Sequence, residues 1–189
     1  FYIDLHPRET KNDGAWMTEY RSQGLFEGKV ERPLVAIVCN LTPSTEEKPS
    51  LLTFSEVETI FHEFGHALHG MLSNVTYSSL ASPDVYWDFV ELPSQIMENW
   101  LGEKETLQLF AKHYETGDDI PDELIEKIKA SQSFNAGITG LRQLSFGFLD
   151  MAWHTGAPTN IENLEAFEDN AIAKTRLLPK IEGTTISCC

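Results

Sequence analysis

Apolar residues recur at helical intervals through the stretch that follows Thr53. The members of this stripe are Ile60, Phe64, Ala67 and Met71. A spacing of three to four residues is typical of one face of an α-helix. Thr53 with Glu56 three residues later fits a capping box, in which the two residues satisfy each other's backbone donors. We therefore predict a helix that begins after Thr53 and ends near Leu72.

The rest of the chain divides into further helices, strands and loops. Residues 34–40 form an apolar, β-branched run that predicts a strand, and residues 1–5 alternate like a shorter one. Residues 42–50 and 73–84 carry turn residues and predict loops. Helical patterns extend over residues 104–116, from Pro121 onward, over 135–154 and over 162–178. The predicted fold class is mainly α with a small antiparallel sheet, that is, α+β.

Composition limits the classes of partner and compartment. The chain has 189 residues, 41% of them hydrophobic, and a net charge of −15. This charge argues against nucleic acid and anionic membrane surfaces as partners. No apolar run approaches the length of a membrane span. The odd cysteine count (Cys39, Cys188 and Cys189) gives no disulfide framework, so we expect a cytoplasmic protein.

Candidate chemistry lies within the first predicted helix, in the pattern H-E-x-x-H formed by His62, Glu63 and His66. Residues four apart share a helix face, so both imidazoles can bind one metal ion from the same side. Glu63, the residue after His62, points about 100° away around the helix axis. It can reach the open coordination position of the metal without being a ligand. This is the pattern of a zinc hydrolase. The alternative is a helical scaffold in which the pattern arises by chance.

A third ligand is expected in the segment that contains Glu91, 25 residues after His66. Catalytic zinc sites usually have three protein ligands and one open position. Glu91, Gln95 and Glu98 share one face of a predicted helix, and this polar face suits a metal site. An ordinary solvated face is the alternative. Pro93 must lie in the first turn of this helix or produce a kink.

With these two motifs in view, the chain resembles the thimet oligopeptidase, or M3, family of zinc metallopeptidases. The resemblance rests on His-Glu-Phe-Gly-His-Ala-Leu-His-Gly from His62 to Gly70 and on Trp-Asp-Phe-Val-Glu-Leu-Pro-Ser-Gln from Trp87 to Gln95. It implies that His62, His66 and Glu91 bind one Zn²⁺ per chain and that Glu63 is the catalytic carboxylate. It also implies a zincin-like catalytic core.

The resemblance further implies that residues 1–189 are an incomplete part of the catalytic domain. The family's N-terminal helical half is missing. The family also has a Gly- and Tyr-rich C-terminal stretch, which would follow soon after the region matching residues 181–187 and stabilise the oxyanion. This stretch is missing as well. Apolar helix faces exposed by these absences would favour self-association of the chain.

The implied function is a zinc-dependent metallopeptidase that hydrolyses short oligopeptides. The run from Gly65 to Gly70 favours the peptidyl-dipeptidases, which release C-terminal dipeptides. An endo-acting oligopeptidase of the same family, or a zinc-binding fragment that is inactive alone, are the alternatives. Asp88 or Glu98 is expected to orient one of the zinc histidines.

Two structural questions follow from the sequence. Gly65 and Gly70 in the first helix let another segment approach it closely. The strand over residues 34–40 has two interpretations, which we weigh equally. It is either an edge strand that pairs with the extended substrate, as zinc peptidases of this kind commonly do, or a buried strand that never meets substrate.

Overall fold

The computed structural model describes residues 1–156, 161–181 and 183–187, which form two compact units. Unit 1 is Phe1–Ile125 and unit 2 is Glu126–Cys189. Cys188 and Cys189 lie outside the described residues, and Cys39 is a buried free thiol. That the whole chain belongs to one catalytic domain stays a prediction.

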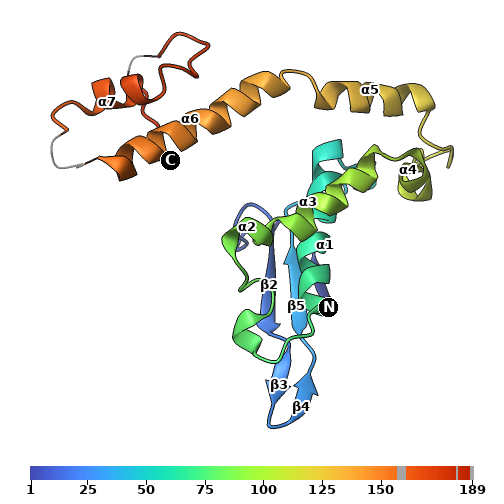
Figure 1. Cartoon of the computed structure of the whole chain (residues 1–189). Coiled ribbons are helices and arrows are strands. Elements are labelled where there is room, and N and C mark those ends of the chain that lie inside the picture. The colour runs from blue at the N-terminus through green and yellow to red at the C-terminus, as the bar shows by residue number, and fades with distance from the viewer. Residues whose placement is uncertain (157–160, 182, 188–189) are drawn as a thin grey trace. The chain divides into compact units, whose positions relative to one another are not determined.

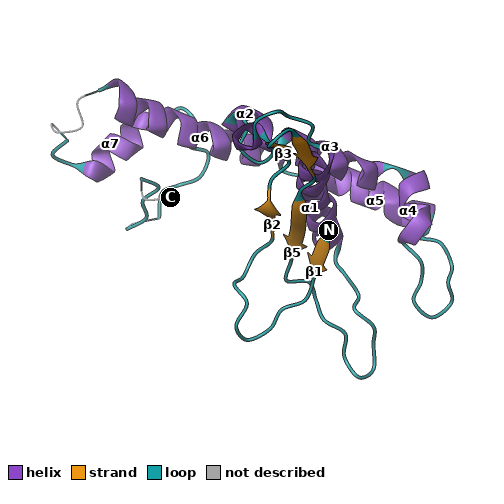
Figure 2. Cartoon of the chain, turned by 90° about the horizontal axis from the view of Figure 1, so that it is seen from below, coloured by secondary structure: helices purple, strands orange, loops and turns teal. Residues whose placement is uncertain are grey.

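Unit 1 contains a three-stranded sheet in the order β1-β5-β2. Figure 2 shows β2 (Trp16–Arg21), β5 (Leu34–Val38) and β1 (Tyr2–Asp4) side by side. β2 is antiparallel to β5, whereas β1 is parallel to it, with Ile3 opposite Ile37. β3 (Gly24–Phe26) and β4 (Lys29–Glu31) form a separate antiparallel hairpin. The α+β class is confirmed, and the larger sheet is mixed rather than wholly antiparallel.

β5 is the central strand of this sheet, so of the two interpretations of residues 34–40 the substrate-pairing edge strand is wrong and the buried strand is confirmed. Val35, Ala36 and Ile37 are each at most 3% exposed. β1 and β2 occupy the two backbone edges of β5, and α1 packs on the sheet beside it. The β-branched apolar run that predicted a strand is also what suits a strand to burial.

The long helix α1 (Phe54–Leu72) has the predicted bounds. The capping box is present, because Glu56 N donates to Thr53 Oγ1, while Glu56 Oε2 accepts from Thr53 N at 2.7 Å. Glu56 Oε1 also accepts from Thr42 N. These backbone donors hold the pKa of Glu56 at about 2. The box thus fixes both the helix start and the preceding loop.

Two short helices lie beside α1, namely α2 (Trp87–Val90) and α3 (Leu92–Glu98). Pro93 is in the first turn of α3, as predicted, where its missing N–H costs no helical hydrogen bond. α3 packs directly on α1 at Gly65 (Figure 1). A Cβ on Gly65 would lie 2.4 Å from the carbonyl oxygen of Pro93, so only glycine permits this approach.

Gly70 permits a second close approach, between α1 and the sheet. A Cβ there would lie 2.5 Å from Oε1 of Glu19 on β2. Both glycines of α1 therefore have the role that the sequence predicted for them.

The later helices are shorter than predicted at two places. Their bounds are η1 (Ser78–Leu80), η2 (Asn99–Gly102), α4 (Lys104–Phe110), α5 (Asp122–Gln132), α6 (Ala136–Thr155) and α7 (Leu164–Ala171). α4 stops at Phe110 instead of residue 116, because the chain turns back there and Lys112 bridges to Asp119. α7 covers only part of residues 162–178, and its Asn163 N-cap accepts from Ala166 N.

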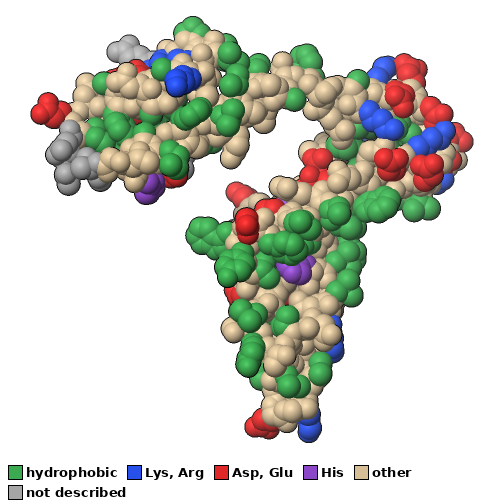
Figure 3. All heavy atoms as spheres, viewed as in Figure 1, with side chains coloured by type: hydrophobic (Ala, Val, Ile, Leu, Met, Phe, Trp, Pro, Cys, Tyr) green, Lys and Arg blue, Asp and Glu red, His purple; other side chains and the backbone are tan. Residues whose placement is uncertain are grey.

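Large apolar side chains remain exposed on unit 1. In Figure 3, hydrophobic side chains gather over the part that contains α2 and α3. Trp87 is 94% exposed, Tyr86 88% and Ile96 55%. Self-association through such a surface stays a prediction. In the described part of the chain, no helix has the length and apolar character needed to cross a membrane.

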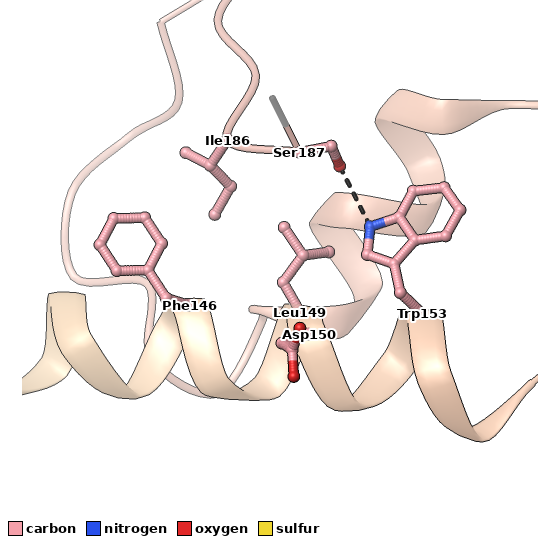
Figure 4. A pocket seen from close by; sticks show the side chains of 6 residues that line it. All are labelled: Phe146, Leu149, Asp150, Trp153, Ile186 and Ser187. Atoms are coloured by element: carbon pink, nitrogen blue, oxygen red, sulfur yellow. Dashed lines mark hydrogen bonds between the residues drawn. The ribbon is translucent and has the colours of Figure 1, made fainter. Parts of the chain in front are cut away.

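Unit 2 has a hollow of about 310 Å³ that is mostly apolar (Figure 4). Phe146, Leu149, Trp153 and Ile186 line it, and Trp153 Nε1 donates to Ser187 Oγ at 3.3 Å. Asp150 is the one titratable side chain among the described residues that line it. The three candidate metal ligands all belong to unit 1.

The Gly65 contact predicts opposite effects for two glycine substitutions. Gly65→Ala should destabilise the fold by about 1–3 kcal/mol, because its methyl group overlaps α3. Gly147→Ala in α6 is the control. A Cβ there meets nothing within 4 Å, so alanine should stabilise its helix by up to about 1 kcal/mol. Urea unfolding followed by circular dichroism measures both. Equal effects of the two substitutions would contradict the close contact.

Candidate metal centre

Three side chains converge where α1 meets the start of α3. His62 and His66 project from α1, with ring centroids 4.9 Å apart, and Glu91 is the N-cap residue of α3. Oε2 of Glu91 lies 3.2 Å from Nε2 of His62 and 3.2 Å from Nε2 of His66. The three ligand atoms lie within 4.8 Å of one another. The structure thus brings together the three residues that the sequence predicted as metal ligands.

These separations fit a zinc ion. Zinc binds imidazole nitrogen and carboxylate oxygen at roughly 2.0–2.1 Å in tetrahedral geometry, which puts neighbouring donor atoms about 3.3 Å apart. The two measured separations of 3.2 Å are close to that value. The donor set of two imidazoles and one carboxylate is also that of known catalytic zinc sites. The residues present therefore fit a zinc ion.

Glu98, at the end of α3, contacts the other nitrogen of His62. Its Oε1 lies 2.6 Å from Nδ1 of His62, which makes Nδ1 the donor when Glu98 is ionised. Asp88, the other residue considered for this role, is exposed. A carboxylate that accepts from the free ring nitrogen fixes the tautomer and orientation of a metal-binding histidine.

This hydrogen bond leaves two acceptors facing each other. A neutral His62 that donates from Nδ1 presents a lone pair at Nε2. That lone pair faces Oε2 of Glu91 at 3.2 Å. Two acceptors at this distance need a proton or a cation between them. The arrangement is therefore suited to a positive ion held between His62 and Glu91.

Glu63 is buried, with 6% of its surface exposed, yet it lines the same hollow as the three ligand candidates. Burial is the main cause that raises its pKa above the usual value, and the charge of Glu91 acts in the same direction. Neighbouring His62 and a backbone hydrogen bond from Met17 oppose this rise. A carboxylate in such surroundings has a stronger tendency to accept a proton.

The two neighbouring ligand candidates have shifted pKa values in the direction that favours metal binding. Burial lowers the pKa of His66, so its neutral form is favoured. The hydrogen bond from Ser94 is the main cause that lowers the pKa of Glu91. A neutral imidazole and an ionised carboxylate are the forms that bind metal.

The hollow has a volume of about 330 Å³ and lies wholly in unit 1. Its lining comprises Ala15, Trp16, Met17, His62, Glu63, His66, Pro83, Val90 and Glu91. Residues 15–17 thus form one wall of it. Trp16 and Met17 are the first residues of β2, which is an edge strand.

Hydrogen bonds connect the loop that precedes residues 15–17 to the residues that follow β5. Asn40 Nδ2 donates to the carbonyl oxygens of Asn12 and Gly14, both at 2.8 Å. Lys11 Nζ donates to Asp4 Oδ1 at 3.0 Å and to the carbonyl of Cys39. These bonds position the segment that leads to Ala15 and connects β1 with β2.

Ser94 also contacts a ligand candidate, and this contact was not predicted from the sequence. It is fully buried, and its Oγ donates to Oε2 of Glu91 at 2.8 Å. The sequence feature that could have indicated this contact is a serine three residues after a glutamate at the start of a helix.

The contact between Glu98 and His62 predicts a loss of metal affinity. Glu98→Ala should weaken zinc binding by about 10–100-fold, the usual cost of removing such a partner. Asp88→Ala is the control and should bind zinc like the unaltered chain, since Asp88 is exposed. Competition with a chromophoric chelator measures both. The assignment of Glu98 is wrong if the two variants bind zinc equally well.

Comparison with known proteins gives a consistent family. The model of peptidase family M3 matches residues 1–185. The chain is 44% identical over 156 residues to oligopeptidase A of Escherichia coli, covering 82% of this chain and 23% of that protein. It is 37% identical over 169 residues to dipeptidyl carboxypeptidase of Escherichia coli, covering 89% of this chain and 24% of that protein.

A plant relative matches along the full chain. The identity to a protein named "Probable cytosolic oligopeptidase A" of Arabidopsis thaliana is 41% over 195 residues, covering 100% of this chain and 28% of that protein. The chain thus spans about a quarter of the length of these curated relatives.

Proposed function

Since the chain belongs to peptidase family M3, we propose that it forms part of the catalytic domain of a zinc-dependent metallopeptidase that hydrolyses short oligopeptides. One observation carries the proposal. His62 Nε2, His66 Nε2 and Glu91 Oε2 converge at zinc-like separations beside a buried Glu63. The names of the relatives, two oligopeptidases and a dipeptidyl carboxypeptidase, support the substrate class.

The roles of the residues follow from their positions. A bound zinc would lower the pKa of a water at its open position to around 7 and polarise the substrate carbonyl. Glu63 takes a proton from the attacking water on a carboxylate oxygen and passes it to the leaving amine. Its burial favours this role, because desolvation makes the carboxylate more basic. Glu98 keeps His62 in the orientation that presents Nε2.

Substrate is proposed to bind along the start of β2. Residues 16 and 17 belong to this edge strand and line the hollow. An extended peptide that adds to an exposed strand edge gains main-chain hydrogen bonds regardless of its side chains. This mode suits a peptidase that acts on many short sequences.

The cleavage mode is proposed to be release of C-terminal dipeptides, with endo-acting cleavage as the alternative. The relatives include proteins named for each mode. Mass spectrometry of products from a ten-residue peptide separates the modes. Dipeptides that appear stepwise from the C-terminus support the first, and a single internal cut supports the second.

The rival functions differ in two measurements. A zinc-binding chain that is inactive alone would hold metal without cleaving peptide, as expected if oxyanion donors lie in other parts of the enzyme. A helical scaffold would bind no metal. Metal analysis together with a quenched fluorescent oligopeptide therefore separates the three readings. We propose a cytoplasmic location, which the relative named as cytosolic supports, whereas a second plant relative is named as organellar.

The proposed ligands predict the effect of losing one histidine. His66→Ala leaves two ligands, so zinc affinity should fall by more than the roughly 10–100-fold cost of losing an outer partner. His154→Ala is the control, because that exposed histidine lies on α6 in unit 2. Atomic absorption after dialysis gives the zinc content. Retention of zinc by His66→Ala at the level of the control would refute this ligand set.

The proposed base predicts a separate effect on catalysis. Glu63→Gln has nearly the same shape but cannot accept the proton of the water. In the full-length protein, kcat should fall by about 10²–10⁴-fold while zinc stays bound. Kinetics on the oligopeptide and zinc analysis of the same sample provide the measurement. A decrease of less than about tenfold at full zinc occupancy would exclude Glu63 as the base.

A further inference from the structure

Ser94 binds the same carboxylate oxygen that faces both histidines. Its Oγ lies 2.8 Å from Oε2 of Glu91, and that oxygen is 3.2 Å from Nε2 of His62 and of His66. Ser94 is 0% exposed, so no solvent competes for its hydroxyl. Each carboxylate oxygen has two lone pairs. One can accept from Ser94 while the other points toward the histidines.

The Glu91 side chain needs such a restraint. It is 51% exposed, and it sits at the junction of α2 and α3 rather than inside a long helix. Without a donor on one oxygen, an exposed carboxylate can rotate and turn either oxygen away from the histidines. Its partner Ser94 is packed closely against α1, because a Cβ on Gly65 would lie only 2.5 Å from Ser94 Cα.

We propose that Ser94 is a positioning residue of the metal site, whose hydroxyl holds Oε2 of Glu91 toward His62 and His66. The inference rests on the proposed zinc site and deepens it. A simpler role exists, because Ser94 Oγ also lies 2.9 Å from the carbonyl oxygen of Glu91, and the two acceptors compete for the single hydrogen of this hydroxyl. Serines on helices commonly make this local bond, as Ser145 does to Arg142 at 2.6 Å.

Ser145 therefore provides a matched control. Ser145→Ala removes the local bond alone, whereas Ser94→Ala removes that bond and the contact with the carboxylate. Ser94→Thr keeps the hydroxyl. Zinc affinity is measured on the 189-residue chain by competition with a chromophoric chelator. The visible spectrum of bound Co²⁺ reports the coordination geometry, which a merely structural role would not change. Circular dichroism verifies folding.

The expected result is a zinc affinity about 10–100-fold weaker for Ser94→Ala, as for other partners of metal ligands. Its Co²⁺ bands should shift. Ser145→Ala should match the unaltered chain in both measurements, and Ser94→Thr should retain most of the affinity.

Several outcomes would overturn the inference. The first is an unchanged affinity and Co²⁺ spectrum in Ser94→Ala. The second is equal weakening in the alanine and threonine variants with unshifted bands, which would indicate packing. If Ser94→Ala does not fold, Ser94→Gly takes its place, and failure of both to fold would show that Ser94 serves the fold. An unaltered chain that binds no zinc would instead refute the proposed function.

Discussion

The close contact between α1 and α3 determines the geometry of the whole candidate site. Gly65 lies between His62 and His66 on α1, and its missing side chain lets α3 approach to the distance of backbone contact. Glu91, at the start of α3, then faces both histidines, while Glu98 contacts His62 and Ser94 contacts Glu91. If α1 and α3 were separated by one additional methyl group, Oε2 of Glu91 would no longer lie 3.2 Å from the imidazole nitrogens of His62 and His66. The glycine at position 65 is thus required for the mutual placement of five side chains, those of His62, His66, Glu91, Ser94 and Glu98.

The parts of this arrangement that are local in sequence could be predicted. The spacing of His62 and His66 places them on one helix face whatever the rest of the chain does. The capping box fixed the start of α1, and Pro93 fixed the first turn of α3. Glu91 was predicted from its helical face and from family resemblance rather than from spacing alone. The structure brings it to both histidines.

What could not be predicted depends on contacts between distant segments. The sequence of β5 indicates an apolar strand but does not indicate which strands pair with it. Its central position in the sheet therefore could not be predicted. The sequence predicted helices that continue past Phe110 and Ala171, but both helices end there and turns follow. After Phe110, the pairing of Lys112 with Asp119 stabilises the turn. The role of Ser94 requires knowing that both Glu91 and Gly65 lie next to it.

All the donor atoms of the candidate centre, and the hollow beside it, come from unit 1. A ligand that binds only the folded form stabilises that form in proportion to the logarithm of its concentration. Zinc bound at this centre would therefore stabilise the folded form of unit 1 directly, because all three ligand atoms belong to that unit. The melting temperature of unit 1 would then depend on the concentration of zinc.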